Sequence, residues 1–248
     1  MRRGALWAAN LLGAAAFAWP FVLPAPGDAP HAREAPFLTA LLLGCLLLVV
    51  LAELGRGGLG PKAVALLGVL GAAMVALRLP GFVAGFSAMF LPVLVAGSAF
   101  GPGFGFTLGA VGTFASGLFV GGLGPWLPFQ TVAVGWVGAG AGLLPRGRGR
   151  IAFLALYGAL AGYLFGAVMN LWFWPFAAGS GPTAWSPGAG PAENLLRYAR
   201  FYALTSFAWD TFRAVGNAAL VLVLGRPALA ALDRAARRMH LEVAPAVG

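Results

Sequence analysis

Long apolar runs separated by short loops constrain this chain more than any other feature of its sequence. About 20 apolar residues are the length that an α-helix needs to cross the hydrocarbon core of a bilayer. Because lipid offers no partner to backbone polar groups, only helices and closed barrels can span it. The pattern predicts eight membrane helices, over Ala5–Leu23, Phe37–Leu54, Ala63–Leu79, Phe82–Phe100, Gly101–Gly122, Val132–Leu144, Ile151–Trp174 and Tyr198–Leu224.

The composition supports the same class. Hydrophobic residues make up 60% of the 248 residues and charged residues 9%, whereas soluble domains carry about 25% charged residues. We therefore expect an all-α integral membrane protein. The net charge of +9 does not predict nucleic-acid binding, because the basic residues stand in short loops between apolar runs rather than on one soluble face.

Metal and disulfide chemistry find no support in the sequence. Cys45 is the only cysteine and lies inside an apolar run, while the two histidines, His31 and His240, stand in a loop and in the C-terminal tail. Neither a zinc site nor a disulfide framework can be built from these residues. We expect no metal and no cofactor.

Small residues recur in steps of four along two of the runs. Such rows let a second backbone approach closely, which is a main source of helix association in lipid. We expect the row in the third run to pack against a helix of a partner protein, with packing inside the chain as the alternative. That row is Gly68, Ala72 and Ala76, and the longer one is Gly101, Gly105, Gly109, Thr113, Gly117 and Gly121.

Prolines predict where helices are interrupted, and basic residues predict which loops face the cytoplasm. The segment Gly124-Pro125-Trp126-Leu127-Pro128-Phe129-Gln130 predicts a break between helices, since two prolines stop a helix. The basic residues of the 55–62 loop, of Pro145–Arg150 and of the C-terminal tail lie inside by the positive-inside rule, and Arg33 and Arg78 lie outside. Both termini are then cytoplasmic. A cleaved signal peptide over the first run is the alternative for the N-terminus.

Several of these segments together resemble the S component of energy-coupling factor (ECF) transporters, the membrane-embedded subunit that binds the substrate. The resemblance covers about residues 63–238 and implies a six-helix core. Residues 1–62 then form an N-terminal transmembrane hairpin with a basic, Gly-rich linker, and residues 239–248 a cytoplasmic tail. The matching features are the small-residue row of Ala63–Leu79, Gly-Pro-Gly-Phe-Gly-Phe, Gly-Pro-Trp-x-Pro-x-Gln as the most specific one, Gly135-Trp136, and Trp209-Asp210 through Arg213 and Asn217.

The resemblance also implies a function and partners. An S component captures a vitamin or related micronutrient from outside, and a T component with two ATPases drives its import. The sequence is most similar to S components for cobalamin or its precursors. The implied partners are this small molecule, the T component, the ATPases and the lipid bilayer, with no nucleic acid.

Eight polar or aromatic residues near the outer helix ends are candidates for ligand binding. Asp210 and Arg213 stand three residues apart on one helix, so they can face each other, and a purely structural ion pair is the alternative. The aromatic residues could wall an apolar pocket or simply mark the membrane interface. Asn170 could instead bond a neighbouring helix. The candidates are Trp126, Gln130, Asn170, Trp172, Tyr202, Trp209, Asp210 and Arg213.

Two other functional classes are alternatives to a transport subunit. An autonomous secondary transporter of a small organic solute would be expected to show related halves or several intramembrane carboxylates, and only Asp210 lies deep in a run. A membrane enzyme is not supported, because the sequence contains no HExxH motif, no paired aspartates and no P-loop. Any ATP hydrolysis must therefore come from another chain.

Overall fold

The structure is a computed structural model of the chain. It describes residues 10–11, 13–18, 21, 44–45, 60–79, 85–120, 124, 126–177, 180–186 and 188–239. Most of the predicted N-terminal hairpin and the tail after Met239 lie outside the described residues, so their predicted roles stay predictions.

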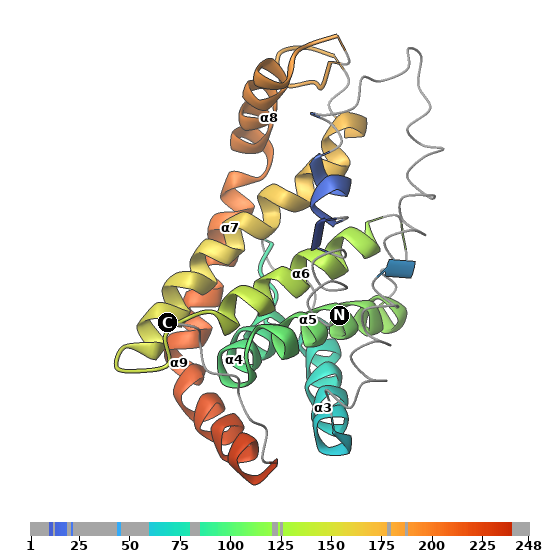
Figure 1. Ribbon diagram of the computed structural model, residues 1–248. Helices are drawn as coiled ribbons and strands as arrows, with labels where there is room; N and C mark the ends of the chain where they lie inside the picture. Colours follow the sequence, from blue (N-terminus) through green and yellow to red (C-terminus); the bar gives the residue numbers. More distant parts are fainter. Residues whose placement is uncertain are drawn as a thin grey trace.

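The described residues form an all-α bundle (Figure 1). Four helices, α3, α5, α7 and α9, contain segments long and apolar enough to cross a bilayer, and α4 is a shorter apolar helix. This confirms the predicted all-α membrane protein. The helices are α3 (Pro61–Arg78), α4 (Phe90–Phe100), α5 (Pro102–Val120), α6 (Leu127–Gly142), α7 (Arg150–Ala177), α8 (Pro191–Thr205) and α9 (Phe207–Met239).

The predicted last helix, Tyr198–Leu224, is wrong in its extent. The chain turns at Ser206, where α8 ends and α9 begins. The backbone N–H of Ser206 still bonds the carbonyl of Tyr202, and its own carbonyl accepts from Asp210, so the turn leaves the backbone bonded. α8 mixes apolar and charged residues, and a hydropathy pattern does not separate such a helix from its apolar neighbour.

Two helix starts also differ from the prediction. α6 begins at Leu127 with Pro128 in its first turn, because a proline is tolerated where the first N–H groups have no helical partner. The second proline therefore opens a helix instead of ending one. α4 begins at Phe90 rather than Phe82, and Gly85 before it has a φ of 80°, which glycine adopts without strain.

Glycines bring α5 and α6 together, backbone against backbone. A Cβ atom built on Gly105 would overlap the carbonyl oxygen of Gly138, and one on Gly109 would overlap that of Val134. A Cβ atom on Gly138 would overlap Gly105 in return. Gly105, Gly109 and Gly117 of the longer predicted row thus pack inside the chain, against α6, while Gly121 lies outside the described residues.

The bundle has two chemically distinct ends. At the end that we call the aromatic end, α6 begins, α7 ends and α9 begins. At the opposite arginine end, Arg150 of α7 bonds Asp233 of α9 at 2.8 Å and Ser98 of α4 at 2.9 Å. In Figure 1, α7 and α9 run side by side between these ends, and α8 continues beyond them at the aromatic end.

Candidate functional site

A buried ion pair joins four parts of the bundle at the aromatic end. Asp210 and Arg213, one turn apart on α9, form a salt bridge. Tyr202 of α8 donates from its hydroxyl to Oδ2 of Asp210 at 2.9 Å. Arg213 donates from Nε to the carbonyl oxygen of Gly85 at 3.0 Å and from Nη1 to that of Gly162 at 3.3 Å. The predicted pair therefore connects α9 with α8, α7 and the segment before α4.

Tyr202 is held in its neutral form in this network. Burial and the hydrogen bond to Asp210 raise the pKa of Tyr202 above its usual value. Its hydroxyl thus keeps the proton that it donates to the carboxylate at physiological pH. The sequence placed Tyr202 and Asp210 on one helix, whereas the turn at Ser206 brings them together from two.

Three glycines of α7 contact the polar residues of α9, Gly166 by leaving room for a side chain and Gly162 and Gly158 by accepting hydrogen bonds at their carbonyl oxygens. A Cβ atom on Gly166 would overlap the carboxylate of Asp210, and Asn217 donates from Nδ2 to the carbonyl of Gly158 at 3.1 Å. Because the two helices are antiparallel, polar residues and glycines pair one to one. The pairs are Asp210 with Gly166, Arg213 with Gly162, and Asn217 with Gly158. Sequence analysis missed this row, although its spacing of four could have revealed it.

A second polar network lies where α3, α5 and α6 meet. Arg78, the last residue of α3, is buried and donates to Oγ of Ser116 at 2.6 Å and to Oε1 of Gln130 at 3.1 Å. The sequence predicts Arg78 as a cation of an outer loop, and its bonds to α5 and α6 were not predicted. A lone arginine at the end of an apolar helix was the available signal, because a buried guanidinium requires polar partners.

Trp126, Phe129 and Trp172 form what we call the aromatic wall, between the start of α6 and the end of α7. The rings of Phe129 and Trp172 stack with centroids 5.8 Å apart, and the centroids of Trp126 and Trp172 are 6.5 Å apart. Trp209 does not join them, because it is 55% exposed on α9. Successive helical residues point about 100° apart, so Trp209 turns outward where Asp210 turns inward.

Four buried polar atoms have no hydrogen-bond partner among the described residues. They are the amide nitrogen of Asn170 on α7, the hydroxyl of Ser87 in the segment before α4, the hydroxyl of Thr113 on α5 and the amide oxygen of Asn217 on α9. Asn170 follows Gly166 by about one turn, on the side of α7 that faces α9. Buried polar groups are nearly always bonded, so an unpaired one marks a place for water or for a ligand.

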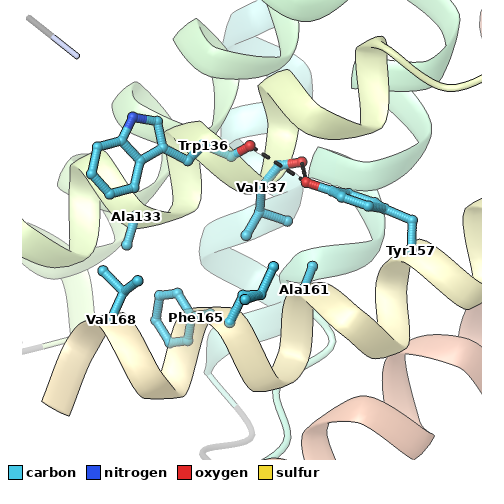
Figure 2. Close-up of a pocket in the computed structure, with 8 residues that line it drawn as sticks. Ala133, Trp136, Val137, Tyr157, Ala161, Phe165 and Val168 are labelled. Atoms are coloured by element: carbon cyan, nitrogen blue, oxygen red, sulfur yellow. Dashed lines mark hydrogen bonds between the residues drawn. The ribbon is translucent and has the colours of Figure 1, made fainter. Parts of the chain in front are cut away.

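A cavity of about 210 Å³ lies between α6 and α7, further from the aromatic end than the aromatic wall. Figure 2 shows that the Tyr157 hydroxyl is directed at the α6 backbone, where it donates to the carbonyl of Val137 at 2.9 Å. The cavity surface is therefore almost wholly apolar. Phe165 separates it from Arg213, whose guanidinium lies 5.1 Å from the centroid of the Phe165 ring. The lining residues are Ala133, Trp136, Val137, Tyr157, Ala161, Leu164, Phe165 and Val168.

Comparison with known proteins adds one decisive observation. Residues 62–225 match the family model of the substrate-specific component of ECF transporters. The chain belongs to this family. No curated protein and no solved structure matches the chain. The resemblance drawn from the sequence is thereby confirmed at the level of the family, and this substrate-specific component is a multi-pass transport subunit, not itself an enzyme.

The family match has consequences for partners. A substrate-specific component works with a T component and ATPase components on a small-molecule substrate. The matched region begins at the start of α3 and ends within α9, so it contains both polar networks, the aromatic wall and the cavity. The helical residues 10–11 and 13–18 lie outside it.

In this substrate-specific component, the small-residue row of α3 lies on the exposed side of the helix. Gly68, Ala72 and Ala76 are exposed, and a Cβ atom on Gly68 would meet no atom within 4 Å. The opposite side packs on α5, where Met74 fills the space beside Gly112. Within the described part of the chain, the α3 row is left uncovered.

Proposed function

We propose that this substrate-specific component captures a vitamin or related micronutrient from outside the cell at its aromatic end. The T component and the ATPases then drive delivery inward. Cobalamin or a cobalamin precursor is the ligand class that we propose. In this orientation the arginine end and both termini are cytoplasmic, in agreement with the positive-inside rule.

The observation that supports this ligand class is the unpaired amide nitrogen of Asn170 and hydroxyl of Ser87, two of the four unpaired polar atoms, beside the aromatic wall at the start of α6 and the end of α7. Ligand sites are usually apolar with a few polar groups that fix orientation. A corrinoid presents a broad ring with amide side chains at its edge. Its ring suits an aromatic wall, and its amides suit the free amide and hydroxyl.

The eight candidate residues divide into two roles in this proposal. Trp126, Gln130, Asn170 and Trp172 face the ligand. Asp210 and Arg213 bond each other and other protein groups, so they hold α7, α8 and α9 in position around it. Tyr202 shares that positioning role through Asp210, and Trp209 lies at the exposed rim of α9.

We also propose that the α3 row is the docking face for a helix of the T component. Three small residues on an exposed, apolar membrane helix allow a partner backbone to approach closely. The neighbouring Val69 is 67% exposed, so apolar contacts beside the row are available to the same partner.

Binding of cyanocobalamin to the purified protein, measured by equilibrium dialysis, tests the ligand proposal. We expect Asn170→Ala to weaken binding about tenfold, because it removes one hydrogen bond to the ligand. Gln130→Ala should weaken it by at least as much, because it also removes the acceptor of the buried Arg78. Asn217→Ala is the comparison on α9. Its Oδ1 is also unpaired, but its Nδ2 bonds Gly158 inside the α7–α9 contact, so this variant should weaken binding less than the other two. Melting temperatures of all variants separate loss of binding from loss of fold.

Two outcomes would redirect the proposal. Normal cyanocobalamin binding by both Gln130→Ala and Asn170→Ala would place the ligand elsewhere. Substrate uptake into cells that lack a T component and ATPases would favour the alternative, an autonomous secondary transporter.

A further inference from the structure

The N-terminal helix packs on the side of α6, although it lies outside the region that matches the family. Its described residues are 10–11, 13–18 and 21. The indole Nε1 of Trp136 donates to Oδ1 of Asn10 at 2.5 Å. Phe17 contacts the rings of Phe129 and Trp136, with centroids 5.1 and 5.5 Å away. One polar bond and two ring contacts therefore dock this helix.

The contacts also give the direction of the N-terminal helix. Asn10 lies at Trp136 and Phe17 at Phe129, so seven residues forward on one helix match seven residues backward on the other. The two helices are antiparallel and in contact over about 10 Å of their length. Phe21, further along, reaches Trp174 and Tyr198, with centroids 6.0 and 6.4 Å away.

Only one side of this helix is used. Gly13, Ala16 and Phe17 are buried, whereas Leu11 is 65% exposed. Gly13 lies so close to α6 that a Cβ atom on it would be 2.9 Å from Cγ1 of Val132. A helix buried along a single stripe sits at the periphery of the bundle, between the bundle and the lipid.

The buried stripe meets the candidate site at three points. Phe17 backs Phe129, which stacks on Trp172 in the aromatic wall. Asn10 fixes the indole of Trp136, which lines the α6–α7 cavity. Phe21 backs Tyr198, which contacts Tyr202 of the ion-pair network with centroids 6.4 Å apart.

We infer that the N-terminal helix is a fixed lateral wall of the ligand site. It closes the side of α6 that carries Val132 and Trp136 toward the bilayer and holds the aromatic wall from behind, so that the ligand enters at the aromatic end and not sideways across α6 from the lipid. The closed face is a property of this chain alone, and only the statement about ligand entry rests on the proposed function. The Asn10–Trp136 bond supports a fixed position, because breaking it would leave the indole N–H of Trp136 without this acceptor in an apolar environment.

A disulfide tests the docking without any ligand. In a Cys45→Ser background, Gly13→Cys with Val132→Cys should cross-link on mild oxidation, because the two side chains are in contact. Leu11→Cys with Val132→Cys is the matched control and should not cross-link, since Leu11 points away from α6. Absence of the 13–132 cross-link in folded protein would overturn the inference.

Thiol labelling tests whether the docked helix closes this side of α6. In the same Cys45→Ser background, Val132→Cys places a thiol beneath Gly13 of the docked helix, and N-ethylmaleimide labelling is followed in detergent-solubilised protein. Adding Asn10→Ala and Phe17→Ala should raise the labelling rate about tenfold or more, because the face then opens. Leu11→Ala should not change it. Should the double variant fail to fold, Asn10→Ala alone serves. An unchanged rate in folded protein shows that the helix is no wall and overturns the inference.

The cross-linked protein then tests the route of the ligand, with cyanocobalamin as the probe. A fixed wall predicts that the 13–132 disulfide leaves cyanocobalamin affinity and binding rate within about twofold of the reduced protein. Loss of binding that returns on reduction would mean that the helix must move, which overturns the inference. Failure of the reduced protein to bind cyanocobalamin counts against the proposed ligand class, while the cross-link and the labelling still decide on the closed face.

Discussion

The α3 and α5 helices carry small residues at the same spacing and use them in opposite ways. On α5, Gly105 and Gly109 lie against the backbone of α6, with no room for a Cβ atom. On α3, Gly68 has open space around it and Ala72 is exposed. In the most apolar 18-residue stretch of α5, 61% of the residues are buried, compared with 28% in that of α3. One spacing therefore serves an internal contact in one helix and, in the other, a surface that the described residues leave uncovered.

The difference shows what a small-residue row can and cannot predict. The spacing predicts close approach of a second backbone, and it does not say which backbone. On α7 a third row, Gly158, Gly162 and Gly166, has yet another use. Gly162 lies against the backbone of Ala214, as the α5 row lies against α6, but Gly166 leaves room for the Asp210 carboxylate, and the carbonyls of Gly162 and Gly158 bond side chains of α9.

Substitutions at the contact between the α7 row and α9 should lower the stability of the protein more than substitutions at the other two rows. Asp210→Ala removes the carboxylate that faces Gly166 and leaves Arg213 buried without its counter-ion. We expect the free energy of unfolding to fall by about 3–5 kcal/mol. Thermal and denaturant unfolding in detergent would measure it.

A double variant sharpens this prediction. Asp210→Ala with Arg213→Leu removes both charges, so it should be more stable than Asp210→Ala alone. Equal or lower stability of the double variant would show that Arg213 contributes through its bonds to Gly85 and Gly162 rather than through the ion pair. Tyr202→Phe, which removes one hydrogen bond, should cost about 1 kcal/mol.

Substitutions in the α5 row should cause the second largest loss of stability. Gly109→Val forces a branched side chain against the carbonyl of Val134, so α5 and α6 must separate. We expect a loss of stability of about 3 kcal/mol, at the upper end for overpacking because the obstructing atoms are backbone. Gly103→Val is a suitable control on the same helix, since a Cβ atom on Gly103 meets nothing within 4 Å. Similar melting temperatures for the two variants would contradict the assigned contact.

The α3 row should show almost no effect on the isolated protein. Ala72→Leu adds an exposed side chain, so stability should change by no more than about 0.5 kcal/mol. Copurification with the T component should nevertheless be lost, because the larger side chain keeps the partner backbone away. Ala219→Leu, the same change at an exposed position of α9, is the control and should copurify normally. Normal copurification of the Ala72→Leu variant with the T component would contradict the docking proposal.

Sequence analysis reached the fold class because hydropathy and chain length directly reflect the bilayer. It also found the Asp210–Arg213 pair, since i, i+3 spacing on a helix is a local property. It could not divide α8 from α9, because the turn at Ser206 breaks no strong pattern. Pro128 was assigned to a break for a related reason, since a proline can end a helix or begin one.

The partners of the polar residues were harder to predict than the residues themselves. Arg78 lies 52 positions from Gln130, and Arg213 lies 128 positions from Gly85. Such contacts depend on how the helices are arranged in space, which one sequence does not give. The role of the first helix was hidden for the same reason, because Asn10 meets Trp136 across 126 positions.

The length of α9 limits how the protein can sit in a membrane. A straight helix of its 33 residues would be about 50 Å long, while the hydrocarbon core is about 30 Å thick. Arg226 comes about 30 Å after Phe207. Pro227 follows it inside the helix, where a proline removes a hydrogen bond and kinks the axis. The last three turns, with the exposed Arg234, Arg237 and Arg238, therefore lie beyond the hydrocarbon core and turn at Pro227 toward the lipid headgroups. These charges fix how deep α9 sits in the membrane.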